Sequence, residues 1–246
     1  MIYVVGIGPG GSGEITPRAR TALERCDVIL GYKTYIELIA PLFGDKDKNK
    51  DIRPFSMTRE EERCREALKL AEDGNTVGLV SGGEPGVYGM AGLMLEIAGA
   101  AQSDVEIEIV PGITAASAAA AVLGAPLTHD FAVISLSDLL TPRELIERRL
   151  DAAAYADFSV CIYNPSSHGR PDHFRWACNV LLRHKSPDTP AGWVRNAGRP
   201  ETSSRVMTLG TIRDEPLDMF CTAIVGNSQT VILNKNLMVT PRGYKI

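Results

Sequence analysis

Four histidines are the side chains of this chain whose ordinary pKa lies near neutrality, so they are the first candidates for proton transfer. His129 stands beside Asp130, a carboxylate that can fix the imidazole tautomer or raise its pKa. The residues alone favour a linker histidine bonded to backbone at position 129, with a catalytic histidine as the alternative. His168 falls in a predicted loop, whereas His173 and His184 are expected on a helix surface.

Three glycine-rich stretches would let the backbone approach a ligand without obstruction by a Cβ atom. They are GIGPGG at 6–11, SGGEPGVYG at 81–89 and PGITA at 111–115. The second and third each follow a predicted strand and precede a helix, where open α/β sheets bind ligands. Two loops with the same placement indicate one shared ligand. Glu84 either accepts a hydrogen bond from that ligand or caps the next helix.

The first stretch also satisfies the GxGxxG pattern of dinucleotide-binding proteins, but its surroundings argue against that function. In a dinucleotide fold the helix begins within the glycine turn, so that its amides meet the pyrophosphate. Here Pro9 removes an amide, and the next helix signal is Thr16 followed by Pro17. The second predicted strand offers no ribose-binding carboxylate. A dinucleotide-dependent reductase therefore remains only as an alternative from another class.

Alternating strand and helix patterns must position these loops, and they predict two α/β domains, 1–126 and 127–246. The first domain is expected to hold a mostly parallel sheet, and the second is expected to be richer in antiparallel pairs. Thr16 is predicted to cap the first helix, and capping boxes are predicted at 58–61 and 141–144. The predicted strands are 2–7, 28–30, 76–81, 105–110, 131–136, 158–163, 192–194, 205–209, 221–225 and 230–233; the predicted helices begin near 17, 58, 90, 113, 141 and 174.

Composition narrows the class of protein further. The 246 residues carry 26 Lys and Arg against 30 Asp and Glu, a formal net charge of −4, which argues against a nucleic-acid partner. No apolar run is long enough to span a membrane, and the N-terminus resembles a strand rather than a signal peptide. Five scattered cysteines without a CxxC pair indicate a reducing cytoplasm and predict neither a disulfide framework nor a zinc or iron–sulfur site.

Taken together and in order, GIGPGG, SGGEPGVYG and VPGITAASAAAAVLGAPL (110–127) resemble the tetrapyrrole (class III) methyltransferases along nearly the whole chain. The resemblance implies two α/β domains with S-adenosylmethionine in the cleft between them, and a homodimer. THDFAVISLSDLLTP (128–142), YNPSSHGR (163–170) and VRNAGR (194–199) are most similar to the branch that methylates C17 of precorrin-3B or cobalt-precorrin-3 during cobalamin biosynthesis, with ring contraction. The sequence departs from the family pattern at Glu84, commonly Asp, and at Gly82, often Ser in this branch.

The resemblance also implies a cofactor site, carried over position by position. In the first domain the S-adenosylmethionine contacts would be Pro9, Gly83, Glu84, Val87, Thr114 and Ala115. In the second domain they would be Tyr163, Asn164, Asn196, Ala197, Thr222 and Ala223.

Methyl transfer from a sulfonium needs alignment of the two reactants more than a strong base. Ring contraction, in contrast, requires protons to be moved, so the resemblance brings His129, Asp130 and Ser135 forward as catalytic candidates. Ser137 and Asp138, beside Ser135 at a strand end, are expected to contact substrate. The substrate's carboxylates would be met by arginines in loops. The substrate-contact candidates are Ser137, Asp138, His168, Arg170, Arg195 and Arg199.

Other functions stay open on the sequence alone. Within the family, methylation at another ring position, such as C11 or C20, and diphthine synthesis are alternatives, although SLSD and YNPSSHGR favour C17. A tetrapyrrole-binding protein that catalyses no reaction is a third alternative, which stays open because Glu84 stands where the family commonly has Asp. Whether the substrate contains cobalt cannot be inferred from the residues.

Overall fold

The computed structural model describes residues 1–44, 50–234 and 236–245. The chain forms two compact units, Met1–Ala115 and Ala116–Ile246. The sequence expectation placed the division after residue 126, so the structure assigns the Ala-rich helix α5 (Ala115–Leu123) almost wholly to the second unit. The reason is packing: Ala116, Ala119 and Leu123 are buried against residues of the second unit's sheet.

The first unit contains a five-stranded, entirely parallel sheet with strand order β3-β2-β4-β1-β5. Its strands are β1 (Ile2–Gly6), β2 (Val28–Tyr32), β3 (Asp51–Phe55), β4 (Val77–Ser81) and β5 (Ile107–Val110). Its helices are α1 (Pro17–Arg25), α2 (Lys33–Ile39), α3 (Glu60–Glu72) and α4 (Ala91–Ala100). Because β4, β1 and β5 are neighbours, the loops that follow these three strands leave the same edge of the sheet side by side.

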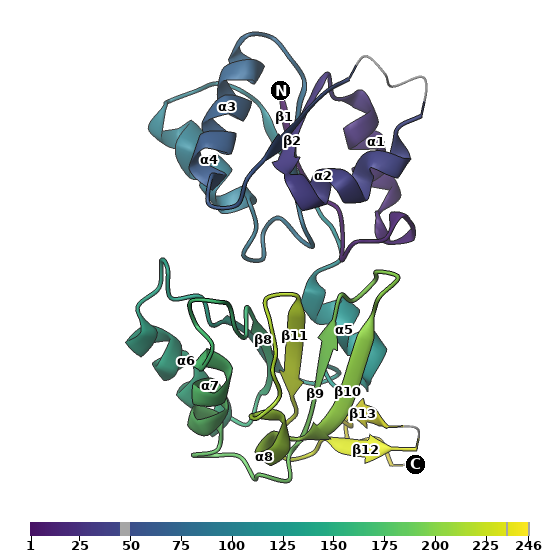
Figure 1. The fold of residues 1–246 in the computed structure, drawn as a ribbon, viewed down its shortest axis with the longest axis vertical. Helices are drawn as coiled ribbons and strands as arrows, with labels where there is room; N and C mark the ends of the chain where they lie inside the picture. Colours follow the sequence, from purple (N-terminus) through teal and green to yellow (C-terminus); the bar gives the residue numbers. More distant parts are fainter. Residues whose placement is uncertain (45–49, 235, 246) are drawn as a thin grey trace. The chain divides into compact units, whose positions relative to one another are not determined.

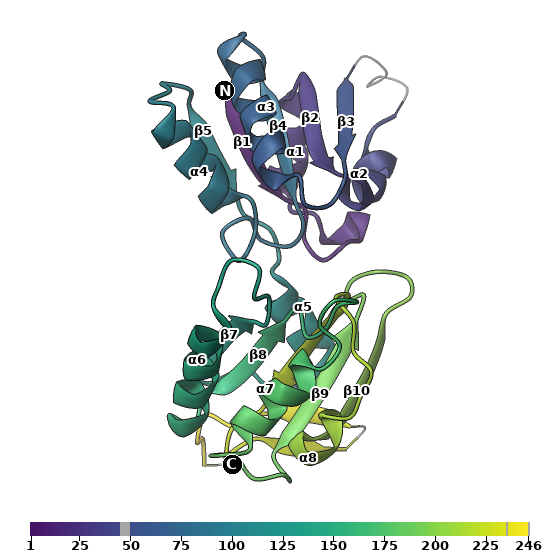
Figure 2. The same cartoon turned by 60° about the vertical axis from the view of Figure 1, so that its left-hand side comes forward.

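Both faces of this sheet are covered, which explains why its central strands β1 and β4 are buried at every position and mostly apolar. Ile2 and Val4 pack with α3 and α4, whereas Tyr3 and Val5 pack with α1 and α2. Figures 1 and 2 show α3 and α4 together on one side of the sheet. The unit is thus a three-layer α/β sandwich, as the alternating strand and helix patterns predicted.

The second unit combines a five-stranded mixed sheet of order β10-β9-β11-β8-β7 with a small sheet of order β12-β13-β6. Only β7 and β8 of the larger sheet run parallel, so the predicted enrichment in antiparallel pairs is confirmed. The strands are β6 (Gly124–Ala125), β7 (Phe131–Ser135), β8 (Ser159–Tyr163), β9 (Pro190–Arg195), β10 (Ser203–Thr208), β11 (Cys221–Val225), β12 (Val231–Leu233) and β13 (Leu237–Val239).

Helices α6 (Arg143–Tyr155), α7 (His173–Leu181) and the short α8 (Leu209–Ile212) cover one face of this larger sheet, around Phe174 and Leu150. The other face packs against α5 through Leu123, whose methyl groups leave no room for a Cβ atom on Gly192 of β9. Helices α6 and α7 lie together in both views (Figures 1 and 2).

Local helix signals were partly wrong. Thr16 caps α1 as predicted, accepting a hydrogen bond from the Ala19 amide at 3.1 Å, with Pro17 in the first turn. The capping box predicted at 58–61 does not form, because Thr58 adopts a left-handed backbone and its hydroxyl donates to the Met57 carbonyl. At 141–144 the N-cap is Pro142, which has no side-chain acceptor, so that box is absent as well.

Candidate active site

The glycine-rich loops of the first unit meet at the carboxyl edge of its sheet. The Ile7 amide donates to the Ser81 carbonyl at 3.0 Å, continuing the pairing of β1 with β4 beyond the strand ends. Gly8 and Gly83 then exchange two backbone hydrogen bonds, of 3.2 and 2.9 Å. The loops after β1 and β4 are therefore fixed to each other at the position where open α/β sheets bind ligands.

Glu84 joins the third loop to this pair. Its Oε1 accepts from the Gly86 amide and its Oε2 from the Gly112 amide, both at 2.9 Å. The loops approach so closely that a Cβ atom on Gly112 would lie 2.2 Å from the Gly83 carbonyl oxygen. Both carboxylate oxygens of Glu84 thus position backbone, a role that neither sequence interpretation of this residue included.

The residues expected at the cofactor in this unit lie on these three loops. Gly83 has a φ of +63°, which favours glycine, and a Cβ atom built there would be in ordinary van der Waals contact with Ile113, Thr114 and Ala115 of the third loop, at 3.8–4.0 Å. Pro9, Val87 and Thr114 are half-buried around it. Such a cradle of partly exposed backbone and small side chains suits a nucleoside-containing ligand that is held mainly through backbone groups.

The backbone after β1 argues against a dinucleotide site at the GxGxxG pattern. After β1 the chain forms a single 3₁₀ turn at Ser12–Glu14, and α1 begins only at Pro17. No helix N-terminus therefore opens within the glycine turn, which is the feature a pyrophosphate site requires.

A second group of predicted residues lies together in the second unit, at the carboxyl ends of β7 and β8. The Asn164 side-chain amide donates to Ser135 Oγ at 2.9 Å, and the Ser137 backbone amide donates to the same oxygen at 3.2 Å. The Tyr163 hydroxyl accepts from the Ala116 amide at 2.7 Å, in the first turn of α5. Asn164 has a φ of +52°, so the chain turns sharply as it leaves β8.

Next to them is an ion-pair cluster centred on Asp138. Its Oδ2 lies 3.0 Å from His173 Nε2, and its Oδ1 lies 3.6 Å from Arg170 Nη1. Arg170 also donates to the Leu136 carbonyl and to the Ser167 hydroxyl. The hydrogen bond from His173 is the main cause that lowers the pKa of Asp138, so this carboxylate stays charged in neutral solution.

His173 is the functional candidate that the sequence missed. It was expected on a helix surface but is buried. The first turn of α7 faces the 136–142 loop, where the Asp138 carboxylate is hydrogen-bonded to His173 Nε2. One signal was available: α7 has apolar residues on the side that carries position 173. His168, in contrast, is exposed within the short turn that pairs Ser167 with Arg170.

The remaining predicted contacts lie at the end of β9 and in β11. Because β9 and β8 both pair with β11, the ends of β9 and β8 lie at the same edge of the second sheet. Arg195 ends β9 and pairs with Asp218 at 2.8 Å, and Asn196 follows it with a φ of +53°. Ala197 and Arg199 continue this turn. Thr222 and Ala223 of β11 are buried, and the Ala223 methyl belongs to the core, so only their backbone could face a ligand.

His129 and Asp130 do not join this cluster. They precede β7, whereas Ser135 ends it, and the intervening strand separates the two ends by about 13 Å. His129 Nδ1 accepts from the Asp130 amide at 2.9 Å, and both side chains are exposed beside a hollow that Asp157 and Arg242 also line. The three catalytic candidates are therefore not brought together within the second unit.

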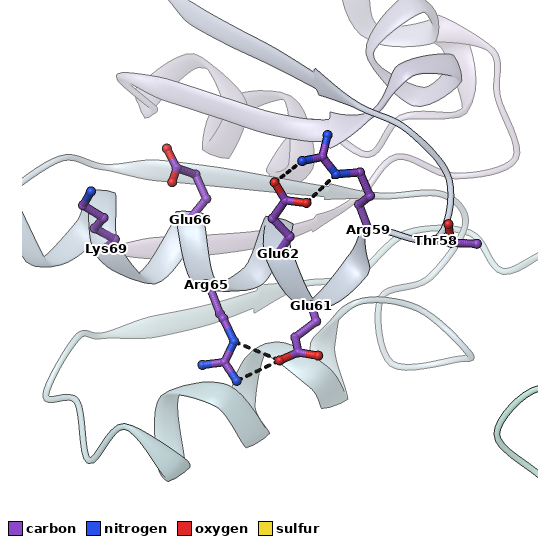
Figure 3. A pocket seen from close by; sticks show the side chains of 7 residues that line it. All are labelled: Thr58, Arg59, Glu61, Glu62, Arg65, Glu66 and Lys69. Carbon is purple, nitrogen blue, oxygen red and sulfur yellow. Dashed lines mark hydrogen bonds and ion pairs between the residues drawn. The ribbon is translucent and has the colours of Figure 1, made fainter.

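A further hollow, of about 510 Å³, lies along the exposed side of α3 (Figure 3). Four of its charged side chains are paired with one another along the helix, Arg59 with Glu62 and Arg65 with Glu61 at 2.8 Å, and Glu66 pairs with Arg53 of β3 at 2.6 Å. Such i,i+3 and i,i+4 pairs are typical of a solvated helix face, so this hollow is not a candidate ligand site.

Residues 1–44, 50–234 and 236–245 contain neither a candidate metal centre nor a candidate membrane span. Within these ranges no group of three His, Cys, Asp or Glu side chains is arranged to hold a metal ion. None of the helices found there is long and apolar enough to cross a membrane.

Fold and site together define a two-unit α/β protein with a glycine-rich ligand edge, and the comparisons with known proteins name its family. Residues 1–213 match the model of the tetrapyrrole (corrin/porphyrin) methylases. A probable cobalt-factor III C(17)-methyltransferase of Salmonella typhimurium is 48% identical over 246 residues, which cover 100% of both chains. The chain therefore belongs to the tetrapyrrole methylase family.

Other similar proteins agree with this assignment. A cobalt-factor III methyltransferase of Priestia megaterium is 46% identical over 99% of this chain, but the match spans only 45% of that longer protein. The solved structure of the methyltransferase CobJ is 36% identical and superimposes with a TM-score of 0.91 over 98% of this chain and 99% of that one. A uroporphyrin-III C-methyltransferase of Thermus thermophilus, solved with S-adenosyl homocysteine, shares the fold, with 24% identity over 92% of this chain and 96% of that one and a TM-score of 0.69.

Proposed function

We propose that the protein transfers a methyl group from S-adenosylmethionine to C17 of precorrin-3B or cobalt-precorrin-3 and assists ring contraction in cobalamin biosynthesis. The observation that carries the proposal is the end-to-end similarity to the Salmonella relative, whose name specifies C17 of cobalt-factor III. The motifs 128–142 and 163–170, which the resemblance tied to this branch, contact each other through Ser135 with Asn164 and Asp138 with Arg170.

The cofactor role is assigned to the glycine-rich edge of the first unit. S-adenosylmethionine supplies an activated sulfonium methyl when it is bound. The three loops, joined by the Gly8–Gly83 hydrogen bonds, would give the cofactor backbone donors and acceptors in a fixed arrangement; the contacts assigned on them are Pro9, Gly83, Val87, Thr114 and Ala115. Glu84 acts indirectly, because its carboxylate holds the Gly86 and Gly112 amides in place. Preorganised loops of this kind lower the cost of aligning two reactants.

From the second unit, we assign cofactor contacts to Tyr163, Asn164, Asn196 and Ala197 and to the backbone of Thr222 and Ala223. Substrate contacts are assigned to Ser135, Ser137, Asp138, His168, Arg170, Arg195 and Arg199. The Ser135 hydroxyl accepts hydrogen bonds from the Ser137 backbone amide and the Asn164 side chain, which hold it among the other proposed substrate contacts. His129 and Asp130 are not included in this site, because β7 separates them from Ser135.

A cytoplasmic homodimer completes the proposal. The hairpin of β12 and β13 exposes the side chains of Val231, Ile232, Leu233 and Leu237. An apolar patch of this kind favours association of two copies. Five free, buried cysteines fit a reducing compartment. Light scattering coupled to gel filtration should give twice the 26.6 kDa chain mass; a mass of one chain contradicts the dimer.

The deciding experiment is incubation with methyl-labelled S-adenosylmethionine and a trimethylated precursor, with and without cobalt, analysed by mass spectrometry and carbon NMR. Label at C17 is the expected result, and its dependence on cobalt identifies the substrate. Label at C11 or C20 refutes the assigned position. Cofactor binding without any methyl transfer refutes the substrate, and absence of cofactor binding refutes the activity.

A further inference from the structure

Within the part of the chain that the structure describes, a buried arginine at the carboxyl edge of the first sheet has no counter-charge in contact with it. Arg63, in the first turn of α3, is 3% exposed. Its Nε and Nη1 have no hydrogen-bond partner, and its Nη2 meets only the Met90 thioether, at 3.2 Å. A thioether is a weak acceptor, so the guanidinium is left largely unsatisfied.

Burying a cation in this way is costly unless an anion compensates it. Burial lowers the pKa of Arg63, and the nearby Glu60 and Tyr35 offset this only in part. Glu60 stands one turn earlier on the same helix but forms no ion pair with Arg63 within 4.0 Å. The arginines of the exposed side, Arg59 and Arg65, both have a glutamate partner, so Arg63 is the exception in this part of α3.

The location of Arg63 links it to the ligand loops. Met90 ends the 81–90 loop, and its amide lies 3.4 Å from the Ser81 hydroxyl at the end of β4. The Tyr35 ring stands where a Cβ atom of residue 82 would project, with its Cζ 2.5 Å from that position. Gly82, a departure from the branch's usual Ser, therefore makes room for Tyr35, directly before Gly83 of the cofactor edge.

We propose that Arg63 is an anion-binding residue that takes a carboxylate of a reactant, with Met90 as the side chain that contacts its guanidinium in the unliganded chain. The proposal rests on the proposed function, which supplies two carboxylate sources: the methionine moiety of S-adenosylmethionine and the acidic side chains of the tetrapyrrole. Met90 can move aside for such a carboxylate, because its unbranched side chain changes rotamer easily. Movement of Met90 frees Nη2, and a carboxylate can then accept from Nε and Nη2 of Arg63 in a bidentate manner.

The test compares the wild type with Arg63→Met, Arg63→Lys and the control Arg65→Met, whose arginine lies on the exposed side of α3. Titration calorimetry measures S-adenosylhomocysteine, and steady-state kinetics measure KM for the trimethylated precursor. Loss of a charge-assisted pair predicts about ten- to hundred-fold weaker binding of one reactant in Arg63→Met, a smaller effect in Arg63→Lys and none in Arg65→Met.

The two sources are separated by which reactant is affected. Weaker S-adenosylhomocysteine binding, with unchanged binding of methylthioadenosine, which lacks the carboxylate, assigns Arg63 to the cofactor. A raised substrate KM with unchanged cofactor affinity assigns it to the tetrapyrrole. Unchanged values for both reactants overturn the proposal while the methyltransferase activity stands. A wild type that binds no S-adenosylhomocysteine overturns the activity and the proposal together.

Thermal unfolding of the unliganded variants gives an independent readout. Removing an uncompensated buried cation should leave the Tm of Arg63→Met equal to or above that of the wild type. A clearly lower Tm for both Arg63→Met and Arg63→Lys, with unchanged ligand affinities, would make Arg63 a structural residue and overturn the proposal.

Discussion

Glu84 offers the sharpest test of how the glycine-rich edge is held together. Its carboxylate accepts from Gly86 and Gly112, which belong to two different loops, so replacing Glu84 should loosen the first unit where the cofactor is proposed to bind. Glu84→Ala removes both acceptors. Glu84→Gln retains one oxygen acceptor and turns a donor toward the other amide.

The magnitude follows from the surroundings of the two bonds. The bond to Gly112 is partly buried and involves a charged acceptor, which is worth about 1.5–3 kcal/mol; the exposed bond to Gly86 contributes about 0.5–1 kcal/mol. Glu84→Ala should therefore lower the free energy of unfolding of the first unit by about 2–4 kcal/mol. Glu84→Gln should cost about half as much, because one of the two bonds survives.

The assay must distinguish the two units. Trp176 and Trp193 both lie in the second unit, so tryptophan fluorescence follows that unit alone in a urea titration. Far-UV circular dichroism reports both, and hydrogen exchange at the Gly112 amide reports the loop directly. Glu96→Ala, on the exposed side of α4, serves as the control and should shift the free energy of unfolding by less than about 0.5 kcal/mol.

The reasoning is refuted if Glu84→Ala unfolds at the urea concentration of the wild type and the Gly112 amide exchanges at an unchanged rate. A loss of stability in the tryptophan signal, without faster exchange at the Gly112 amide, would likewise contradict it, because the contact lies in the first unit.

Three further predictions concern packing and charge. Asp138→Asn should lower the free energy of unfolding at pH 7, and the difference from the wild type should shrink as the pH falls below 3.8. The pKa of Asp138 is lowered, mainly by its hydrogen bond with His173, so its stabilising charge is present above its ordinary pKa and is lost as the pH falls through the folded pKa. Urea titrations at pH 7 and at successively lower pH measure this difference. Gly112→Ala should lower the free energy of unfolding by at least about 1–3 kcal/mol, because its Cβ would overlap the Gly83 carbonyl oxygen. Gly92→Ala, which has open space around it in α4, should raise the free energy of unfolding by about 0.5–1 kcal/mol. Urea midpoints equal to that of the wild type would contradict both predictions. Burial raises the pKa of every thiol, to about 12 at Cys26. A thiol reagent at pH 8 should therefore label no cysteine of the native chain and all five in urea. Fast labelling of the native chain would refute the burial of the thiols at positions 26, 64, 161, 178 and 221.

Much of the architecture follows from local sequence. The run from Ile2 is apolar and β-branched, and the helix after it has both a Thr cap and a Pro in its first turn, so this strand and helix were predicted. Edge strand β3 was missed, because Asp51–Phe55 contains a proline and is only partly buried, so it lacks the pattern of a central strand. Helix α2 was missed as well, since it follows β2 without a turn signal or a side-chain cap.

The predicted cofactor loops of the first unit also follow from sequence, because a glycine-rich turn after a strand is a local feature and the parallel order of strands brings such turns to one edge. In the second unit the residues at the ends of β7 and β8 were found for the same reason: Ser135 and Tyr163 are paired across neighbouring strands. Strand direction likewise explains why His129 is separated from Ser135, although only six positions divide them in the sequence.

The sequence by itself determined the alternation of strands and helices, the glycine-rich turns and the family, because each depends on short stretches of residues in order. The tertiary structure decided which charges meet. Glu84 bonds to Gly112, Asp138 to His173, and Arg63 is buried against Met90, each through contacts between positions 27 to 35 residues apart. Such pairings depend on the packing of whole elements, and no local periodicity encodes them.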